Sequence, residues 1–198
     1  MATAVLVPDS DVLVTWPTTS PTSPATHFSK IDEGVDTVDN ADWNRVRGNT
    51  TTPFGFSERF GLQNVPLDVD TITKVEFRFV ADRDVADPGL DEFVFNVEIH
   101  DGTGDNPIDP PTNGVPVDLA TQDDTRFHTY GWTTYVDSLS LTKAQGDGLE
   151  LVCWVAIPPT VNDRITLSAF EVRITYTPVL SSDKHKMDIG LGFGPGFK

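Results

Sequence analysis

The clearest hydrophobic pattern in the chain is a long strand-like stretch over residues 165–176. Ile165, Leu167 and Ala169 are apolar at odd positions, and the apolar set then moves to Phe170 and the even positions that follow it. Side chains of a β-strand alternate between two faces, so a slip of one residue moves the apolar set to the opposite face. The pattern therefore predicts a long strand with a β-bulge, a strong twist or a passage between two sheets near Ala169.

Two further stretches alternate apolar and polar residues in the manner of half-buried antiparallel strands. Val75, Phe77 and Phe79 share one face of a stretch over residues 71–82. Residues 92–100 alternate in the same way and follow after a loop that contains a Pro-Gly turn. We therefore expect these two stretches to pair with each other as a long hairpin or meander.

The remaining strand signals are shorter and are separated by turn residues. Residues 148–157 are apolar on both faces from Leu151 onward, which predicts a central strand that is buried on two sides. Residues 115–119 fit an edge strand, because Pro116 cannot donate a ladder hydrogen bond. Short strands are also predicted at 3–7, 11–16, 27–31, 43–46, 54–60 and 127–136, with a turn at 8–10 and either a strand or a helical turn at 138–144. Helical periodicity is nearly absent.

These patterns together predict an all-β chain that folds as an antiparallel β-sandwich of jelly-roll type. We expect residues 1–178 to form this single domain. Residues 17–25 hold three prolines among Ser and Thr, and such a segment favours an exposed loop over a central strand.

Residues 179–198 lose the strand alternation and end in GLGFGPGFK. Phe193 and Phe197 stand among glycines there, whereas an ordinary frayed terminus is polar. We interpret the segment as an irregular C-terminal arm outside the sandwich, and we expect Met187, Phe193 and Phe197 to bind a partner. Arms that become ordered only on assembly lose entropy but cover a large surface.

The composition adds a strongly acidic surface. Asp and Glu number 30 against 14 Lys and Arg, for a formal net charge of -16. Such a charge repels nucleic acid backbones and anionic membranes, so we expect neither as a partner. The simpler interpretation is a solvated surface that keeps the protein soluble, and the alternative is attraction to a basic partner or to divalent cations. The sequence shows neither a basic signal-peptide start nor a stretch of about 20 apolar residues, so we expect synthesis in a cytoplasm without a membrane span.

No sequence motif indicates catalysis. The single cysteine, Cys153, lies in an apolar run and is expected to be a small core residue. The four histidines have no metal-binding spacing, and His100 and His128 are expected on polar strand faces. We therefore expect neither an enzyme nor a cofactor. Trp43 lies in an acidic context and is the best candidate for an exposed, sugar-stacking aromatic, whereas Trp132 and Trp154 are expected in the core.

Two acidic segments are candidates for calcium, which prefers six to eight oxygen ligands. The first segment contains Asp36 and Asp39, and the second contains Asp101, Asp105 and Asp109. Neither spacing matches a fixed calcium motif. The competing interpretation is that these residues fill turns, because an Asp side chain accepts hydrogen bonds from the local backbone.

Three stretches of the chain, 26–43, 71–84 and 164–178, and the Gly-Trp pair at 131–132, resemble a diffuse group of phage-encoded jelly-roll proteins. In that group an N-terminal Trp strand precedes an acidic segment ending in Asp-Tyr, a strand rich in valine, and a closing strand with a Glu-Val pair. Trp43 stands here where the group often has Tyr. The resemblance extends over about residues 10–178 through short motifs, and it assigns no catalytic or binding residue.

The resemblance implies a structural component of a tailed-phage virion. We expect a capsid decoration or cement protein, made in the host cytoplasm and carried on the particle exterior. Its partners would be the major capsid protein and further copies of itself in a homo-oligomer. The alternatives are a tail or neck accessory protein and a carbohydrate-binding β-sandwich module for host adsorption.

Overall fold

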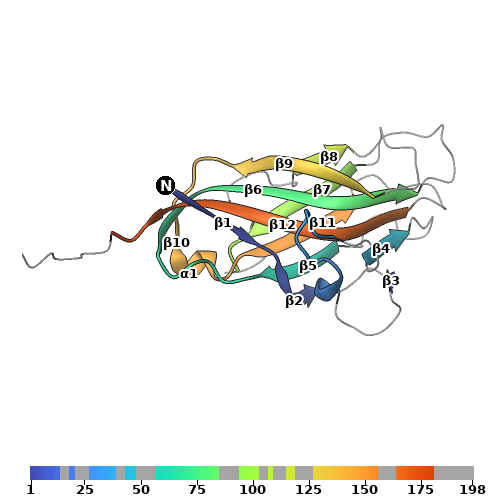
Figure 1. Cartoon of the computed structure of the whole chain (residues 1–198), viewed down its shortest axis with the longest axis horizontal. Helices are drawn as coiled ribbons and strands as arrows, with labels where there is room; N and C mark the ends of the chain where they lie inside the picture. Colours follow the sequence, from blue (N-terminus) through green and yellow to red (C-terminus); the bar gives the residue numbers. More distant parts are fainter. Residues whose placement is uncertain are drawn as a thin grey trace, which may run out of the picture.

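The protein is an all-β sandwich of two antiparallel sheets, seen in a computed structural model (Figure 1). The structure describes residues 1–13, 18–20, 27–38, 43–47, 57–84, 94–102, 107–108, 115–118, 127–155 and 164–180. The predicted all-β class and the antiparallel sandwich are confirmed. Besides the strands, these residues form one short 3-10 helix, η1 (Phe28–Lys30), and one short α-helix, α1 (Lys143–Gly146).

The first sheet has seven strands and is built around two long ones, β6 (Val69–Asp84) and β12 (Arg164–Pro178). These two strands pair antiparallel along nearly their whole length. The strands beside β6 are β9 (His128–Val136) and β10 (Leu141–Thr142). The strands beside β12 are β1 (Ala2–Leu6) and β4 (Trp43–Arg47), with β3 (Thr18–Ser20) beyond β4.

The second sheet has five strands in the order β2-β5-β11-β7-β8. Their bounds are β2 (Pro8–Leu13), β5 (Ser57–Leu62), β11 (Glu150–Val155), β7 (Val94–His100) and β8 (Val115–Asp118). The central place of β11 and the edge place of β8 are as predicted. Only one face of β11 is fully buried, because Val152 and Trp154 are half-exposed.

Four of the strand pairs are nested along the chain. β1 pairs with β12, β5 with β11, β6 with β9 and β7 with β8. Early strands therefore pair with late ones, and the innermost pair joins strands that are consecutive in the sequence.

The core between the sheets is organised around Phe79. Its ring lies 5.6 Å from the Phe170 ring, 5.1 Å from the Phe95 ring and 4.6 Å from the Tyr130 ring, between centroids. Phe79 and Phe170 come from the first sheet, and Phe95 comes from the second. Stacked and tilted aromatic pairs at these separations add to the free energy gained by burying apolar area.

The phase slip in β12 corresponds to a β-bulge. Leu167 pairs with Ala81 and Ala169 pairs with Val80, so Ser168 is an extra residue in β12. The bulge keeps the apolar set on the inner face, where Leu167 and Phe170 both join the core. The predicted β-bulge near Ala169 is therefore confirmed. The alternative of a passage between two sheets is wrong, because β12 stays in one sheet.

Two sequence predictions about the course of the chain are wrong. The stretches at 71–82 and 92–100 do not pair, because β6 lies in the first sheet and β7 in the second. Residues 8–10 do not form a turn, because β2 begins at Pro8, and the chain changes sheets at Val7. In each case the alternation identifies the strand, but the partner is set by the nested pairing of the whole chain.

Residues 27–31 form a helical turn and not a strand. The carboxylate of Asp11 accepts hydrogen bonds from the backbone N–H groups of His27 (2.8 Å) and Phe28 (2.7 Å). A carboxylate at this position satisfies the amides that a helical turn leaves free and favours the turn electrostatically. The stretch at 138–144 contains both expected alternatives, β10 followed by α1.

We predict that Phe79→Ala destabilises the fold by about 3–5 kcal/mol, because the ring is 1% exposed and contacts both sheets. Urea unfolding followed by circular dichroism measures the change. Val12→Ala is the control: this side chain is 48% exposed, so its truncation should lower the free energy of unfolding by about 1 kcal/mol or less. Equal effects of the two substitutions would contradict the placement of the core.

Candidate functional site

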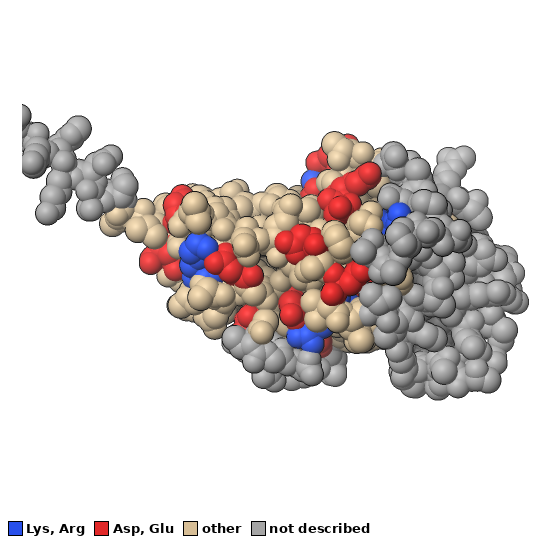
Figure 2. Space-filling model, turned by 90° about the horizontal axis from the view of Figure 1, so that it is seen from below, with Lys and Arg blue, Asp and Glu red and all other residues tan. Residues whose placement is uncertain are grey.

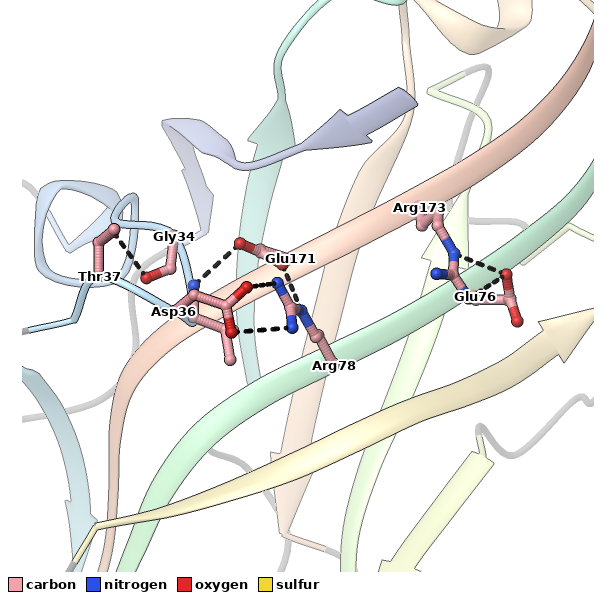
Figure 3. Close-up of polar contacts among 8 residues, drawn as sticks. Gly34, Asp36, Thr37, Glu76, Arg78, Glu171 and Arg173 are labelled. Carbon is pink, nitrogen blue, oxygen red and sulfur yellow. Dashed lines mark hydrogen bonds and ion pairs between the residues drawn. The ribbon is translucent and has the colours of Figure 1, made fainter. Parts of the chain in front are cut away.

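The outer face of the first sheet carries two neighbouring groups of paired charged side chains (Figure 3). This charged array consists of Asp36, Lys74, Glu76, Arg78, Glu171 and Arg173. The strand register creates it: Glu171 lies opposite Arg78, and Arg173 lies opposite Glu76. Opposite charges that face each other across an antiparallel pair stabilise the sheet.

Glu171 connects the array to the segment that follows η1. Its carboxylate accepts a hydrogen bond from Arg78 Nε and another, at 2.9 Å, from the backbone N–H of Val35. Arg78 extends to Asp36, with 2.7 Å between Nη2 and Oδ2. Burial acts to lower the pKa of Arg78, but the hydrogen bonds and charges of Asp36 and Glu171 outweigh it and raise the pKa. Residues 31–38 are thereby fastened to β6 and β12.

Glu76 forms the second part of the array. Its carboxylate accepts hydrogen bonds from Lys74 Nζ and from Arg173 Nε, each at 2.8 Å. Burial acts to raise the pKa of Glu76, but the hydrogen bonds and charges of Lys74 and Arg173 lower it overall. The charged form of Glu76 is therefore favoured in the folded protein.

Trp132 lies against both arginines of the array. The guanidinium carbons of Arg78 and Arg173 are 4.7 Å and 4.1 Å from the centre of the indole ring, within the range of cation–π interactions. We expected Trp132 in the core. Tyr130 does stack on Phe79, but Trp132 is half-buried and joins the array.

An irregularity in β9 explains this separation. Phe79 pairs with Tyr130 and Phe77 pairs with Thr133, so a single residue of β6, Arg78, faces two residues of β9. One of those two residues is Trp132. The extra residue shifts the alternation and turns the indole to the outer face.

The array suits a positioning role. Its three cations and three carboxylates cancel in formal charge, and each carboxylate accepts a hydrogen bond from an arginine. Charge-assisted contacts of this kind are stronger than neutral hydrogen bonds, and they hold Trp132 and residues 31–38 in place on the sheet. In the sequence, both strands carry charged residues two positions apart. Which charges pair can be told only once the register of the two strands is known.

A second polar contact lies inside the sandwich. His27 Nδ1 is 3.0 Å from Glu58 Oε2, and the side chain of Glu58 is fully buried. Cys153 lies close by and is buried as predicted. Burial and the neighbouring charge of Glu58 raise the pKa of the Cys153 thiol well above its usual value, which disfavours a nucleophilic thiolate. His100 is also buried, contrary to the expected polar-face position.

The calcium candidates divide between described and undescribed parts of the chain. Asp36 is paired with Arg78, and Asp101 accepts a hydrogen bond from Gln145. Asp39, Asp105 and Asp109 lie outside the described residues. Within the described ranges, no group of three or more His, Cys, Asp or Glu side chains is placed to hold a metal ion.

The predicted partner-binding residues Met187, Phe193 and Phe197 also lie outside the described residues. The tryptophans differ from expectation: Trp154 is half-buried like Trp132, so neither is a fully buried core residue. Trp43, expected to be the exposed one, is half-buried too.

Comparison with known proteins assigns no family to the chain. No protein-family model matches the sequence, and no curated protein matches it. Among the described residues, no helix is long and apolar enough to cross a membrane. A functional proposal therefore rests on the residues and on the fold.

We predict that Glu171→Ala releases residues 31–38 from the sheet. The backbone N–H of Val35 loses its acceptor, and Arg78 keeps a single carboxylate partner, Asp36, whose side chain is 77% exposed. Loss of a partner of buried polar groups costs about 1–3 kcal/mol. Hydrogen exchange at the Val35 amide should accelerate. Asp36→Ala, which removes an exposed ion pair, should cost no more than about 1 kcal/mol. Unchanged exchange at Val35 in Glu171→Ala would argue against this fastening.

A second prediction concerns acid stability. The folded-state pKa of Glu76 is lowered, so its contribution is fully present above the unfolded-state pKa of about 4.3 and is lost as the pH falls through the folded value. Glu76→Gln should be less stable than the parent at pH 7, and the difference should shrink between about pH 5 and pH 3. Urea unfolding across this range measures both proteins. A difference that stays constant down to pH 3 would show that the Glu76 charge is not responsible.

Proposed function

We propose that this chain is a structural component of a tailed-phage virion, a decoration or cement protein that binds and stabilises the capsid exterior. The observation that carries the proposal is the nested pairing of its strands. A jelly roll can be drawn as one antiparallel hairpin wound around a sandwich, so that the first strand pairs with the last and each following strand pairs one step further inward. β1 with β12, β5 with β11, β6 with β9 and β7 with β8 have this order.

Jelly-roll sandwiches recur in viral capsid proteins and in lectins. A fold does not define a function, so this step is an analogy at the level of the fold. It gains weight from the resemblance of residues 71–84 and 164–178 to phage structural proteins, because these are the stretches that form the central pair β6 and β12.

The surface supports an assembly role. Acidic side chains are spread over the described part of the face in Figure 2, with few Lys or Arg among them. A strongly acidic subunit is steered toward basic surfaces of other particle proteins and away from nucleic acid. The partners proposed are the major capsid protein and further copies of this chain, in the virion. The tail or the neck is the alternative place in the particle.

A carbohydrate-binding module for host adsorption is the second candidate, and Trp132 favours it. Its ring lies on an outer sheet face among charged side chains, held by Arg78 and Arg173. An aromatic ring that is fixed in this way offers a stacking surface at little entropic cost.

We predict that the purified protein cosediments with capsids of the phage that encodes it, with saturable stoichiometry. Phe193→Ser with Phe197→Ser should weaken cosedimentation, because apolar anchors lose their burial on the particle. Val12→Ser, which changes an exposed side chain of edge strand β2, is the matched control and should bind like the parent. Glycan binding that Trp132→Ala abolishes, without any binding to capsids, would replace this proposal by the second candidate.

A further inference from the structure

We propose that one end of the sandwich is a docking surface for residues 181–198 of a second copy of this chain. This end patch consists of Met1, Leu67, Val179 and Leu180. The inference deepens the proposed structural function, on which it rests for its biological setting, by naming the self-interaction that would link neighbouring subunits.

The end patch gathers apolar side chains that stand just outside the ends of three neighbouring strands. Ala2 of β1 lies opposite Tyr176 of β12, and Pro178 lies opposite Val69 of β6. Beyond that pair, the backbone N–H of Val179 donates to the carbonyl of Asp68 at 2.7 Å. Met1 and Leu67 therefore stand at the same end of the sandwich as Val179 and Leu180. In Figure 1 this is the end from which the chain continues past β12.

These side chains are among the most exposed apolar groups of the protein. Met1 is 94% exposed, Leu67 90% and Leu180 91%. Of the seven large apolar side chains that are exposed in the described residues, four belong to the end patch. Exposed apolar groups that cluster in this way mark interaction surfaces, whereas single ones need no explanation.

The charge distribution selects the occupant. Residues 181–198 hold three Lys and two Asp, a net charge of +1. Because the whole chain carries -16, residues 1–180 carry a net charge of -17. The exposed residues Asp68 and Asp70 flank the end patch. The apolar groups Met187, Phe193 and Phe197 match the patch, and Lys184 and Lys186 match its acidic rim. The terminal segment is therefore complementary to the body of this chain both in polarity and in charge.

A second copy is the occupant that satisfies both chains at once. In a two-fold dimer, each segment binds the end patch of the other subunit. The two contacts are equivalent by symmetry, so both patches are covered. The two bodies, which repel each other at -17, need not touch, since the segments bridge them.

Complementation between two full-length variants tests this exchange. Leu67→Ser with Val179→Ser damages the patch and leaves the segment intact, whereas Phe193→Ser with Phe197→Ser damages the segment and leaves the patch intact. The parent should self-associate in sedimentation velocity experiments. Each variant alone should associate at least about tenfold more weakly, because at least one buried apolar side chain is lost. An equimolar mixture should form a one-to-one heterodimer through the one intact pair of patch and segment.

Val12→Ser is the control, since it removes an exposed apolar side chain of β2 outside the patch, and it should associate like the parent. A parent that stays monomeric at all concentrations would overturn the inference. A mixture of the two variants that fails to associate would also overturn it. So would a patch variant that keeps the mass of the parent in solution while its residues 181–198 lose hydrogen-exchange protection, because the segment would then dock on its own chain.

The two proposals fail separately. A monomeric parent that still binds capsids would remove the self-interaction and keep the proposed function. A parent that exchanges segments but does not bind capsids would keep the self-interaction and remove the virion role.

Discussion

The structure depends on the antiparallel pairing of β6 with β12. This pair forms the middle of the first sheet, and its two faces have different tasks. On the inner face, Phe79 and Phe170 lie opposite each other and stack in the core. On the outer face, the same register places Glu171 opposite Arg78. A shift of the register by one residue would exchange these faces and bury charges, which costs several kcal/mol per unpaired ion.

The same pairing connects the charged array with the end patch. Near the middle of β12, the Glu171 carboxylate accepts hydrogen bonds from the backbone N–H of Val35 and from the guanidinium of Arg78. At the end of β12, Pro178 lies opposite Val69, and the contact between Val179 and Asp68 directs the chain out of the sandwich. The positioning of residues 31–38 and the position from which the terminal segment leaves are thus two consequences of one register.

The sequence predicted strands well and neighbours poorly, for a physical reason. Alternation reports which face of a strand is buried, and Val75 and Phe77 were placed correctly on the inner face. It carries no information about which strand lies alongside, because that choice depends on the closure of the whole sandwich. Residues 27–31 failed differently: the carboxylate of Asp11, sixteen residues before His27, converts an apparent strand into a helical turn. The charged array was missed because charge pairs across strands exist only once the register is known.

The bulge at Ser168 shows how a local insertion in a strand maintains both faces. Before the bulge, odd-numbered residues such as Leu167 face the core, and after it even-numbered residues such as Phe170 do. Without the extra residue, Glu171 and Arg173 would continue the odd phase and face the core, while Phe170 would face outward. With it, Ala169 packs outside against Val35 and Val80, directly beside the charged array. The phase slip that marks this strand in the sequence is therefore what allows the strand to carry an aromatic core on one face and an ionic network on the other.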